Sequence, residues 1–173
     1  MIKIISAFPG TGKTYAFKNQ KALGLKLVDS DSSLFHWSTD EHGNKIPHPE
    51  WPENYGNYIK KMYDDDSIDY IMVSSHKEVR DIIHEMGMEY NIVVPSGLLK
   101  SEYMRRYRER GSSEAFIKMM DEKFDEFLES LHHDPHAFRV TKLHGNASSI
   151  YGLLSIMKHY ENTHCIRGAN ETV

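Results

Sequence analysis

The sequence lacks the features of secreted and membrane-spanning proteins. It has one cysteine, Cys165, in 173 residues, which excludes an internal disulfide framework and is typical of a reducing compartment. No apolar run approaches the ~20 residues that a membrane-spanning helix needs. The amino-terminal residues MIKIISAFPG do not resemble a secretory signal, because their short apolar stretch runs straight into a glycine-containing loop. We therefore expect a cytoplasmic protein without a membrane partner.

An excess of positive charge is also absent. The formal net charge is -4, which gives no general attraction to nucleic acid or to anionic membranes. Basic residues are concentrated instead in one short segment, residues 100–110. The proportion of apolar residues is ordinary for a globular protein, and the length suits one domain with its own core. We expect a single domain over residues 1–173, as a monomer or a homodimer.

Apolar and amphipathic segments alternate along the chain and predict an α/β fold. Short buried strands are expected at about residues 2–6, 25–28, 68–74, 90–94 and 138–143. Helices are expected at about 13–22, 54–64, 77–86, 98–110, 113–132 and 148–160, before a polar, frayed tail over 162–173. This order predicts a five-stranded parallel sheet between two layers of helices. Residues 32–54 are expected to form a long irregular loop, which in a compact domain is usually functional or disordered.

Residues 7–14, AFPGTGKT, follow the pattern of a phosphate-binding loop (Walker A), with Ala7 replacing its first glycine. The expected strand precedes the loop and the expected helix follows it. Gly10 and Gly12 allow backbone conformations that turn successive amides towards phosphate oxygens. Lys13 is expected to reach the β- and γ-phosphates of ATP, and Thr14 to coordinate Mg²⁺. The residues predicted to bind the nucleotide are Pro9, Gly10, Thr11, Gly12, Lys13, Thr14 and Tyr15. The alternative is a glycine turn without a ligand.

Acidic residues follow the second expected strand, in the sequence Asp29-Ser30-Asp31. In an open α/β sheet, ligands gather at the carboxyl ends of the strands. A carboxylate there can orient Mg²⁺ or accept the proton of an attacking hydroxyl. The alternative is a capping turn, for which Asp and Ser are suited regardless of function.

The third expected strand lacks the acidic residue that the Walker B motif places at its carboxyl end. It ends with residues 73–76, VSSH, and Asp69 lies at its opposite end. This absence favours Asp29 as the metal ligand and weakens the case for a conventional ATPase. His76 is either a catalytic base or a loop histidine with a packing role.

The basic segment lies on the fourth expected helix. Arg106 and Arg110 are four residues apart and share one helix face. They are expected either to close over a transferring phosphoryl group, in a lid over about residues 100–116, or to form a solvated face paired with Glu102 and Glu109. The long loop supplies aromatic residues that either stack on an acceptor or fill a small satellite core, namely Phe35, Trp37, Trp51 and Tyr55.

The phosphate loop, the acidic turn and the arginine segment together resemble the P-loop kinase superfamily, in the branch of shikimate, gluconate and nucleoside monophosphate kinases. The resemblance implies that Asp29 lies nearer the metal and Asp31 nearer the acceptor hydroxyl. It also implies that Arg106 and Arg110 close over the phosphoryl group. A narrower similarity is to phage-type kinases, including those that phosphorylate hydroxymethylated pyrimidines.

The predicted function is transfer of the γ-phosphoryl group of ATP to a small acceptor, a nucleotide or nucleoside. Lys13, Asp31, Arg106 and Arg110 are the predicted catalytic residues, and Thr14 and Asp29 the predicted magnesium ligands. One alternative acceptor is a hydroxymethylated base in DNA, which would require a local basic groove and salt-sensitive binding. The other alternative is a nucleotide-binding regulatory module without turnover. The histidines are not expected to form a zinc site.

Overall fold

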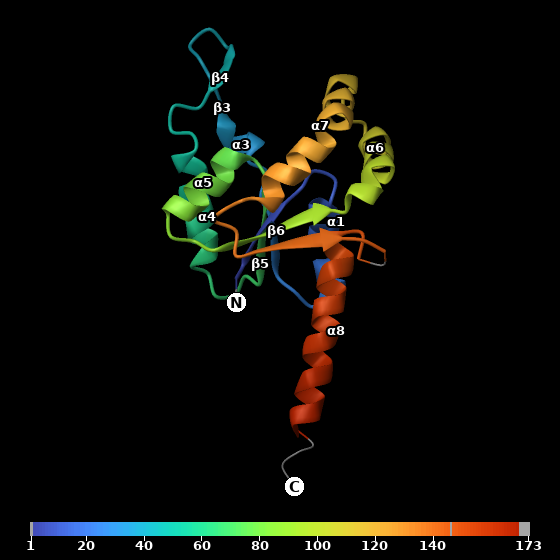
Figure 1. The fold of residues 1–173 in the computed structure, drawn as a ribbon. Coiled ribbons are helices and arrows are strands. Elements are labelled where there is room, and N and C mark those ends of the chain that lie inside the picture. The colour runs from blue at the N-terminus through green and yellow to red at the C-terminus, as the bar shows by residue number, and fades with distance from the viewer. Residues whose placement is uncertain (1, 146, 170–173) are drawn as a thin grey trace.

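A computed structural model describes residues 2–145 and 147–169 of the chain (Figure 1). Its main sheet has five strands in the order β2-β5-β1-β6-β7, and all neighbouring pairs are parallel. The strands are β1 (Ile4–Ala7), β2 (Leu27–Asp29), β5 (Tyr70–Ser74), β6 (Tyr90–Pro95) and β7 (Arg139–Leu143). The predicted five-stranded parallel sheet is therefore confirmed.

Alternation along the strands supplies both faces of the sheet with apolar side chains. Ile71 and Val73 of β5 face one core, whereas Tyr70 and Met72 face the other. The first core is covered by α4 (Glu53–Tyr63), α5 (Lys77–Glu85), α6 (Lys100–Glu109) and α7 (Glu114–His132). The second is covered by α1 (Lys13–Lys18), α2 (Gln20–Leu23) and α8 (Ile150–Ala169). Two helical layers therefore enclose the sheet, and the fold is the predicted three-layer α/β/α arrangement (Figure 1).

Parallel pairing brings the ends of the strands together at one edge. Ala7 pairs with both Ser74 and Val93, and Asp29 pairs with Met72. The segments that follow β1, β2 and β5 therefore leave the sheet at the same edge, although they are far apart in sequence. This edge carries the phosphate loop, the acidic turn and residues 74–76.

Residues 32–54 are more ordered than predicted. They contain a short helix, α3 (Ser33–His36), and an antiparallel pair of strands, β3 (Trp37–Thr39) and β4 (Lys45–Pro47). Asp40 forms the turn, since its carboxylate accepts hydrogen bonds from the amides of His42 and Asn44. The prediction of an irregular loop was wrong here, because the polar turn residues masked a hairpin that extends beyond the sheet edge (Figure 1).

Helix boundaries differ from the predictions at three places. The predicted helix over 13–22 is two helices, which meet at Asn19. A 3-10 turn, η1 (Gly97–Leu99), precedes α6. The last helix continues to Ala169, so residues 162–169 of the expected frayed tail are helical and residues 170–173 lie outside the described residues.

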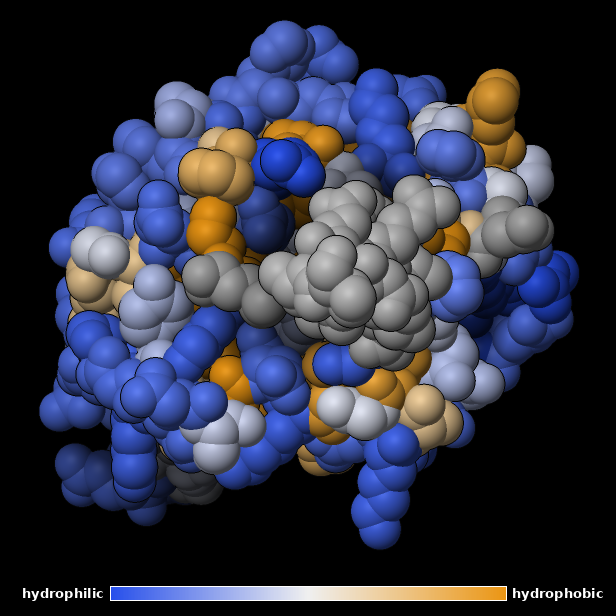
Figure 2. Space-filling model, turned by 90° about the horizontal axis from the view of Figure 1, so that it is seen from below, coloured by the Kyte–Doolittle hydropathy of each residue, from blue (hydrophilic) through white to orange (hydrophobic). Residues whose placement is uncertain are grey.

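The face of the molecule that is seen from below is mainly hydrophilic, and its apolar side chains lie in separate small groups (Figure 2). Among the described residues, no helix combines the length and apolar character needed to cross a membrane.

Candidate functional site

The phosphate loop is held in shape by its backbone and by α6. Gly10 and Gly12 have φ values of 83° and 88°, in the left-handed region that favours glycine. A Cβ atom on Gly10 would lie 2.8 Å from Cε1 of Tyr107, so α6 packs directly against the loop. The Tyr107 hydroxyl donates a hydrogen bond of 2.8 Å to the carbonyl of Pro9. Glycine at position 10 therefore serves both the turn and the close approach of the helix.

A cavity of about 270 Å³, the donor cavity, opens beside this loop. Its lining residues are Gly10, Gly12, Lys13, Thr14, Tyr15, Arg106 and Arg110. Two predicted nucleotide-binding residues lie elsewhere: Pro9 lines a different cavity, and the buried Thr11 hydroxyl donates to the carbonyl of Phe8. Thr11 therefore shapes the loop through its side chain.

Lys13 lies near the carbonyl of Ala7, with 3.5 Å between that oxygen and Nζ. Burial lowers the pKa of the Lys13 amino group, and the nearby cation Arg110 acts in the same direction. The carboxylates of Asp29 and Asp31 partly oppose this shift. Burial thus disfavours the charged form of this amino group, and an incoming phosphate would stabilise that form.

The structure brings Thr14 and Asp29, the two predicted magnesium ligands, together. The Thr14 hydroxyl donates a hydrogen bond of 2.6 Å to Oδ2 of Asp29. A hydroxyl and a carboxylate beside a phosphate-binding loop are the oxygen ligands that Mg²⁺ uses, together with phosphate oxygens and water. These two residues therefore fit a magnesium ion. Asp69 lies away from this pair, at the other end of β5, where it accepts from the amide of Lys26.

Asp31 makes the contact expected of a capping turn, which was the alternative interpretation of the acidic segment. Its Oδ1 atom accepts a hydrogen bond of 2.9 Å from the amide of Ser33 at the start of α3. The next residue, Ser32, is bonded to Ser74 through their hydroxyl groups, 3.0 Å apart. These contacts fix the acidic turn against the end of β5, and the Asp31 side chain stays at the exposed edge of the site.

The two predicted lid arginines have different environments. Nη1 of Arg106 donates to the carbonyls of Gly10 and Ser148, and its Nε atom donates to Glu102. Arg110 instead places its guanidinium 4.8 Å from the ring centre of Tyr107 and 5.2 Å from that of Phe116. Arg106 therefore braces the loop, and Arg110 is the arginine better suited to meet a phosphoryl group.

Hydrogen bonds from Arg105 and Arg106 lower the pKa of Glu102 to about 2. The Glu102 carboxylate, which accepts from Arg106, thus remains charged at neutral pH. Arg105 lies on the outer side of α6, where it pairs with Glu102 and Glu109. The paired face predicted as the alternative therefore describes Arg105, and in part Arg106, which pairs with Glu102 while it lines the donor cavity together with Arg110.

The segment after β7 contributes contacts that sequence analysis missed. The amide of Ile150 donates to the carbonyl of Thr11 at 2.9 Å, and Ser148 accepts from Arg106. Tyr151 packs edge-on against Tyr15, with ring centres 5.4 Å apart. The sequence feature that could have indicated these contacts is a run of small and polar residues shortly after the last strand, at 145–149.

A second cavity of about 270 Å³, the acceptor-side cavity, lies across the loop from the donor cavity. It is lined by Phe8, Pro9, Ser75, His76, Lys77, Arg80, Phe116, Met119, Met120, Phe127, Ser130 and Leu131. Ser75 and His76, which end the third expected strand, border this cavity. For the residues of α7 the sequence predicts only a helix, because core and cavity residues are of the same types there.

The aromatic residues of 33–55 mainly pack on one another. The Phe35 ring meets Tyr55 at 5.2 Å, and Tyr55 is fully buried. His36 is stacked between Trp37 and Trp51, at 4.6 Å from each ring centre. Tyr55 thus belongs to the first core, and Phe35 and Trp51 pack against that core instead of filling a separate satellite core, whereas Trp37 remains 40% exposed. Among the described residues, no three His, Cys, Asp or Glu side chains gather as a metal site.

Comparisons with known proteins provide independent evidence on the fold. No protein-family model and no curated protein matches the chain. Among solved structures, the chain is similar to a shikimate kinase from Bacteroides thetaiotaomicron, with 14% identity and a TM-score of 0.56, covering 94% of this chain and 98% of that one. A gluconokinase from Sinorhizobium meliloti 1021 is similar at 13% identity and a TM-score of 0.51, covering 94% and 95%.

At these identities the comparisons establish the fold alone. The chain shares the fold of both neighbours, and its phosphate loop and strand order are those of a P-loop NTPase fold. The assignment of an activity therefore depends on the residues of the site.

Proposed function

We propose that this protein is an ATP-dependent kinase that transfers the γ-phosphoryl group to a hydroxyl of a small acceptor, a nucleoside or nucleotide. The observation that carries the proposal is the pair of cavities on either side of the phosphate loop. Gly10 lines the donor cavity and its neighbour Pro9 lines the acceptor-side cavity. Two substrates bound there would meet at the loop, as phosphoryl transfer requires.

In the proposed reaction the acceptor oxygen forms a bond to the γ-phosphorus while the bond from phosphorus to the β–γ bridging oxygen breaks. The acceptor proton passes to the carboxylate of Asp31, and the products are ADP and a phosphate ester. Lys13 and the loop amides hold the phosphates, and Arg110 neutralises charge on the transferring group. Thr14 and Asp29 would hold Mg²⁺, which neutralises phosphate charge when bound. Asp31 lies at the exposed edge of the site, where the Ser33 amide holds only its Oδ1 atom.

A phosphoryl-transfer assay tests the proposal. The purified protein would receive labelled ATP and Mg²⁺ with nucleosides, nucleoside monophosphates, sugar acids and DNA containing hydroxymethyluracil. We expect transfer to one acceptor class, reduced by about 10²–10³-fold in Lys13→Ala. Lys18→Ala is the matched control, since Lys18 is an exposed lysine at the far end of the same helix. Transfer at the same rate in both variants would contradict the proposed role of the loop.

A second candidate function is a nucleotide-binding module without turnover. It is favoured by one observation, the end of β5 at Ser74 without an acidic residue. Tight, Lys13-dependent ATP binding with no transfer to any acceptor in the panel would support this candidate over the kinase.

A further inference from the structure

The acceptor-side cavity has an apolar wall built from the phosphate loop and α7. Phe8 is buried beneath it, and Phe116, Met119 and Phe127 come from one face of α7. Aromatic and methionine side chains contact flat rings over a large area, and methionine adapts to their shape. A few polar groups at one end of such a wall are typical of small-molecule sites.

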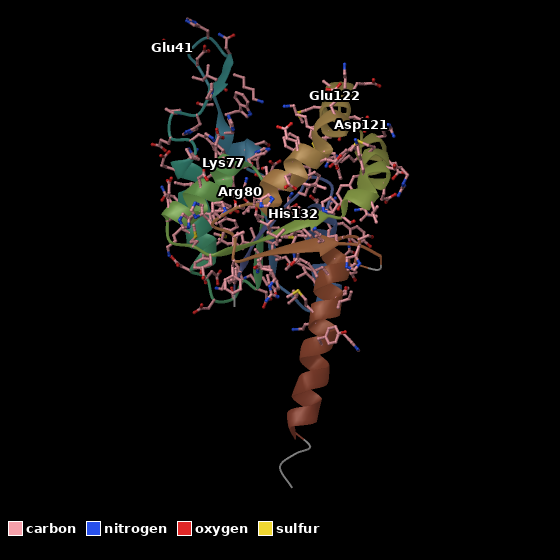
Figure 3. All side chains as sticks on the ribbon, in the orientation of Figure 1. Glu41, Lys77, Arg80, Asp121, Glu122 and His132 are labelled. Atoms are coloured by element: carbon pink, nitrogen blue, oxygen red, sulfur yellow. The ribbon has the colours of Figure 1, made fainter. Side chains whose placement is uncertain are left out.

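Both cations that line this cavity already have an acidic partner. Arg80 is only 5% exposed, forms an ion pair through Nη1 with Asp134, and donates from Nε to the carbonyl of Ser75. Lys77 is paired with Asp81, with 2.6 Å between Nζ and Oδ2. Both cations lie on α5 beside the lower part of α7 (Figure 3). An anionic group in the cavity would therefore compete with Asp134 for the buried Arg80, and with Asp81 for the exposed Lys77.

No acidic residue is among the described residues that line this cavity, and its two cations are balanced by Asp81 and Asp134, which lie outside the lining. Burial lowers the pKa of His76, so its imidazole is uncharged at neutral pH. Glu78 and Asp31 both act electrostatically on His76, and Glu78 is fixed by a hydrogen bond from Nε1 of Trp51. Lys13 and His36 also act on His76. The donor cavity, by contrast, is lined by Lys13, Arg106 and Arg110.

We propose that the acceptor-side cavity binds the ring of an uncharged acceptor, and that the preferred substrate is a nucleoside-type hydroxyl compound. Nucleoside monophosphates and sugar acids would bring an anionic group to an apolar wall whose cations are already paired. The ring lies against Phe116, Met119 and Phe127. The hydroxyl end points to His76, which lines the cavity just after the carboxyl end of β5, at the sheet edge that carries the phosphate loop and the acidic turn. This inference rests on the proposed kinase function and sharpens its substrate class.

A binding experiment with chemically matched probes tests the inference. Thymidine and its own 5′-monophosphate share a ring and a sugar and differ only by the anionic group. Each would be titrated calorimetrically into the protein saturated with a non-hydrolysable ATP analogue and Mg²⁺. We expect thymidine to bind at least about tenfold more tightly than its monophosphate, and also more tightly than shikimate or gluconate.

A charge-introducing variant provides the second measurement. Met119 lines the cavity and is 39% exposed, so Met119→Lys adds a cation there without burying it in the core. The variant should lose about tenfold in thymidine affinity and narrow or reverse the preference against the monophosphate. Met157→Lys is the matched control: Met157 is 40% exposed on α8, which runs away from α6 and α7 (Figure 1). It should leave both affinities unchanged.

The outcomes separate the inference from the kinase function on which it rests. Lys13-dependent transfer to a monophosphate or a sugar acid in preference to thymidine would support the kinase function and overturn the neutral-acceptor inference. Equal responses of Met119→Lys and Met157→Lys would overturn the assignment of the ring to this cavity. Absence of transfer to every acceptor, with ATP bound, would instead count against the kinase function itself.

Discussion

The donor and acceptor-side cavities have similar volumes but are built in different ways. Five of the seven residues that line the donor cavity come from the stretch 10–15, and the backbone and cations dominate it. The acceptor-side cavity draws on segments around residues 8, 76 and 116–131, and apolar side chains dominate it. Local sequence therefore encodes the donor chemistry, whereas acceptor recognition depends on how distant elements pack. Four predictions test this contrast, from the largest expected effect to the smallest.

Arg80→Met should lower the free energy of unfolding by about 3–5 kcal/mol, because it leaves Asp134 buried without its cation. Denaturant unfolding followed by circular dichroism would measure the change. Arg105→Met is the matched control on the donor side, since Arg105 is an exposed arginine of α6 with two acidic partners. We expect little change there. A loss as small for Arg80 as for Arg105 would mean that the acceptor side does not depend on the buried pair.

Asp29→Asn should weaken binding of ATP·Mg²⁺ by about 10–100-fold, because it removes the carboxylate that Thr14 contacts. Titration of a fluorescent ATP analogue with and without Mg²⁺ would separate the metal-dependent part. Asp69→Asn carries the same substitution at the opposite end of the sheet and should not change nucleotide affinity. If both variants bind the nucleotide equally well, Asp29 has no metal role.

Tyr107→Phe removes a hydroxyl beside the phosphate loop, and Tyr90→Phe removes one beside the Arg80–Asp134 pair of the acceptor-side cavity. The Tyr107 hydroxyl bonds the carbonyl of Pro9, and the Tyr90 hydroxyl bonds Asp134. Each variant should lose about 0.5–1.5 kcal/mol of stability. Only Tyr107→Phe should also weaken ATP binding, by less than about tenfold, since only that hydroxyl holds the phosphate loop. Equal ATP affinities in the two variants would contradict this difference.

ATP binding should take up a fraction of a proton on the alkaline side of neutrality. The lowered pKa of Lys13 means that its amino group loses its proton at a lower pH than an exposed lysine does. Bound phosphate favours the charged form and raises that pKa, so ATP affinity should fall as pH rises through the lowered value. Calorimetry at a series of pH values below the ordinary lysine pKa of 10.5, in buffers of different ionisation enthalpy, would measure the uptake. Lys13→Met should abolish it.

The parts that could be predicted from the sequence are those with a local physical signal. Short apolar segments predicted the strands, and the Gly-Lys-Thr of the loop together with the acidic turn after the second strand predicted that Lys13, Thr14 and Asp29 lie at one edge of the sheet. The β3–β4 hairpin was missed because Asp40 and Gly43 are equally typical of irregular loops. The acceptor-side cavity could not be predicted, because Phe116 and Met119 follow the same helical periodicity as the core residues Met120 and Phe124.

Phe116 contributes to both sites at once. Its ring lines the acceptor-side cavity, and the Arg110 guanidinium of the donor cavity lies 5.2 Å from that ring's centre. A ligand that orders Phe116 also restricts the arginine stacked on it, so occupancy of one cavity changes the entropy lost on filling the other. Such thermodynamic linkage is reciprocal: the factor by which an acceptor tightens ATP binding is the factor by which ATP tightens acceptor binding.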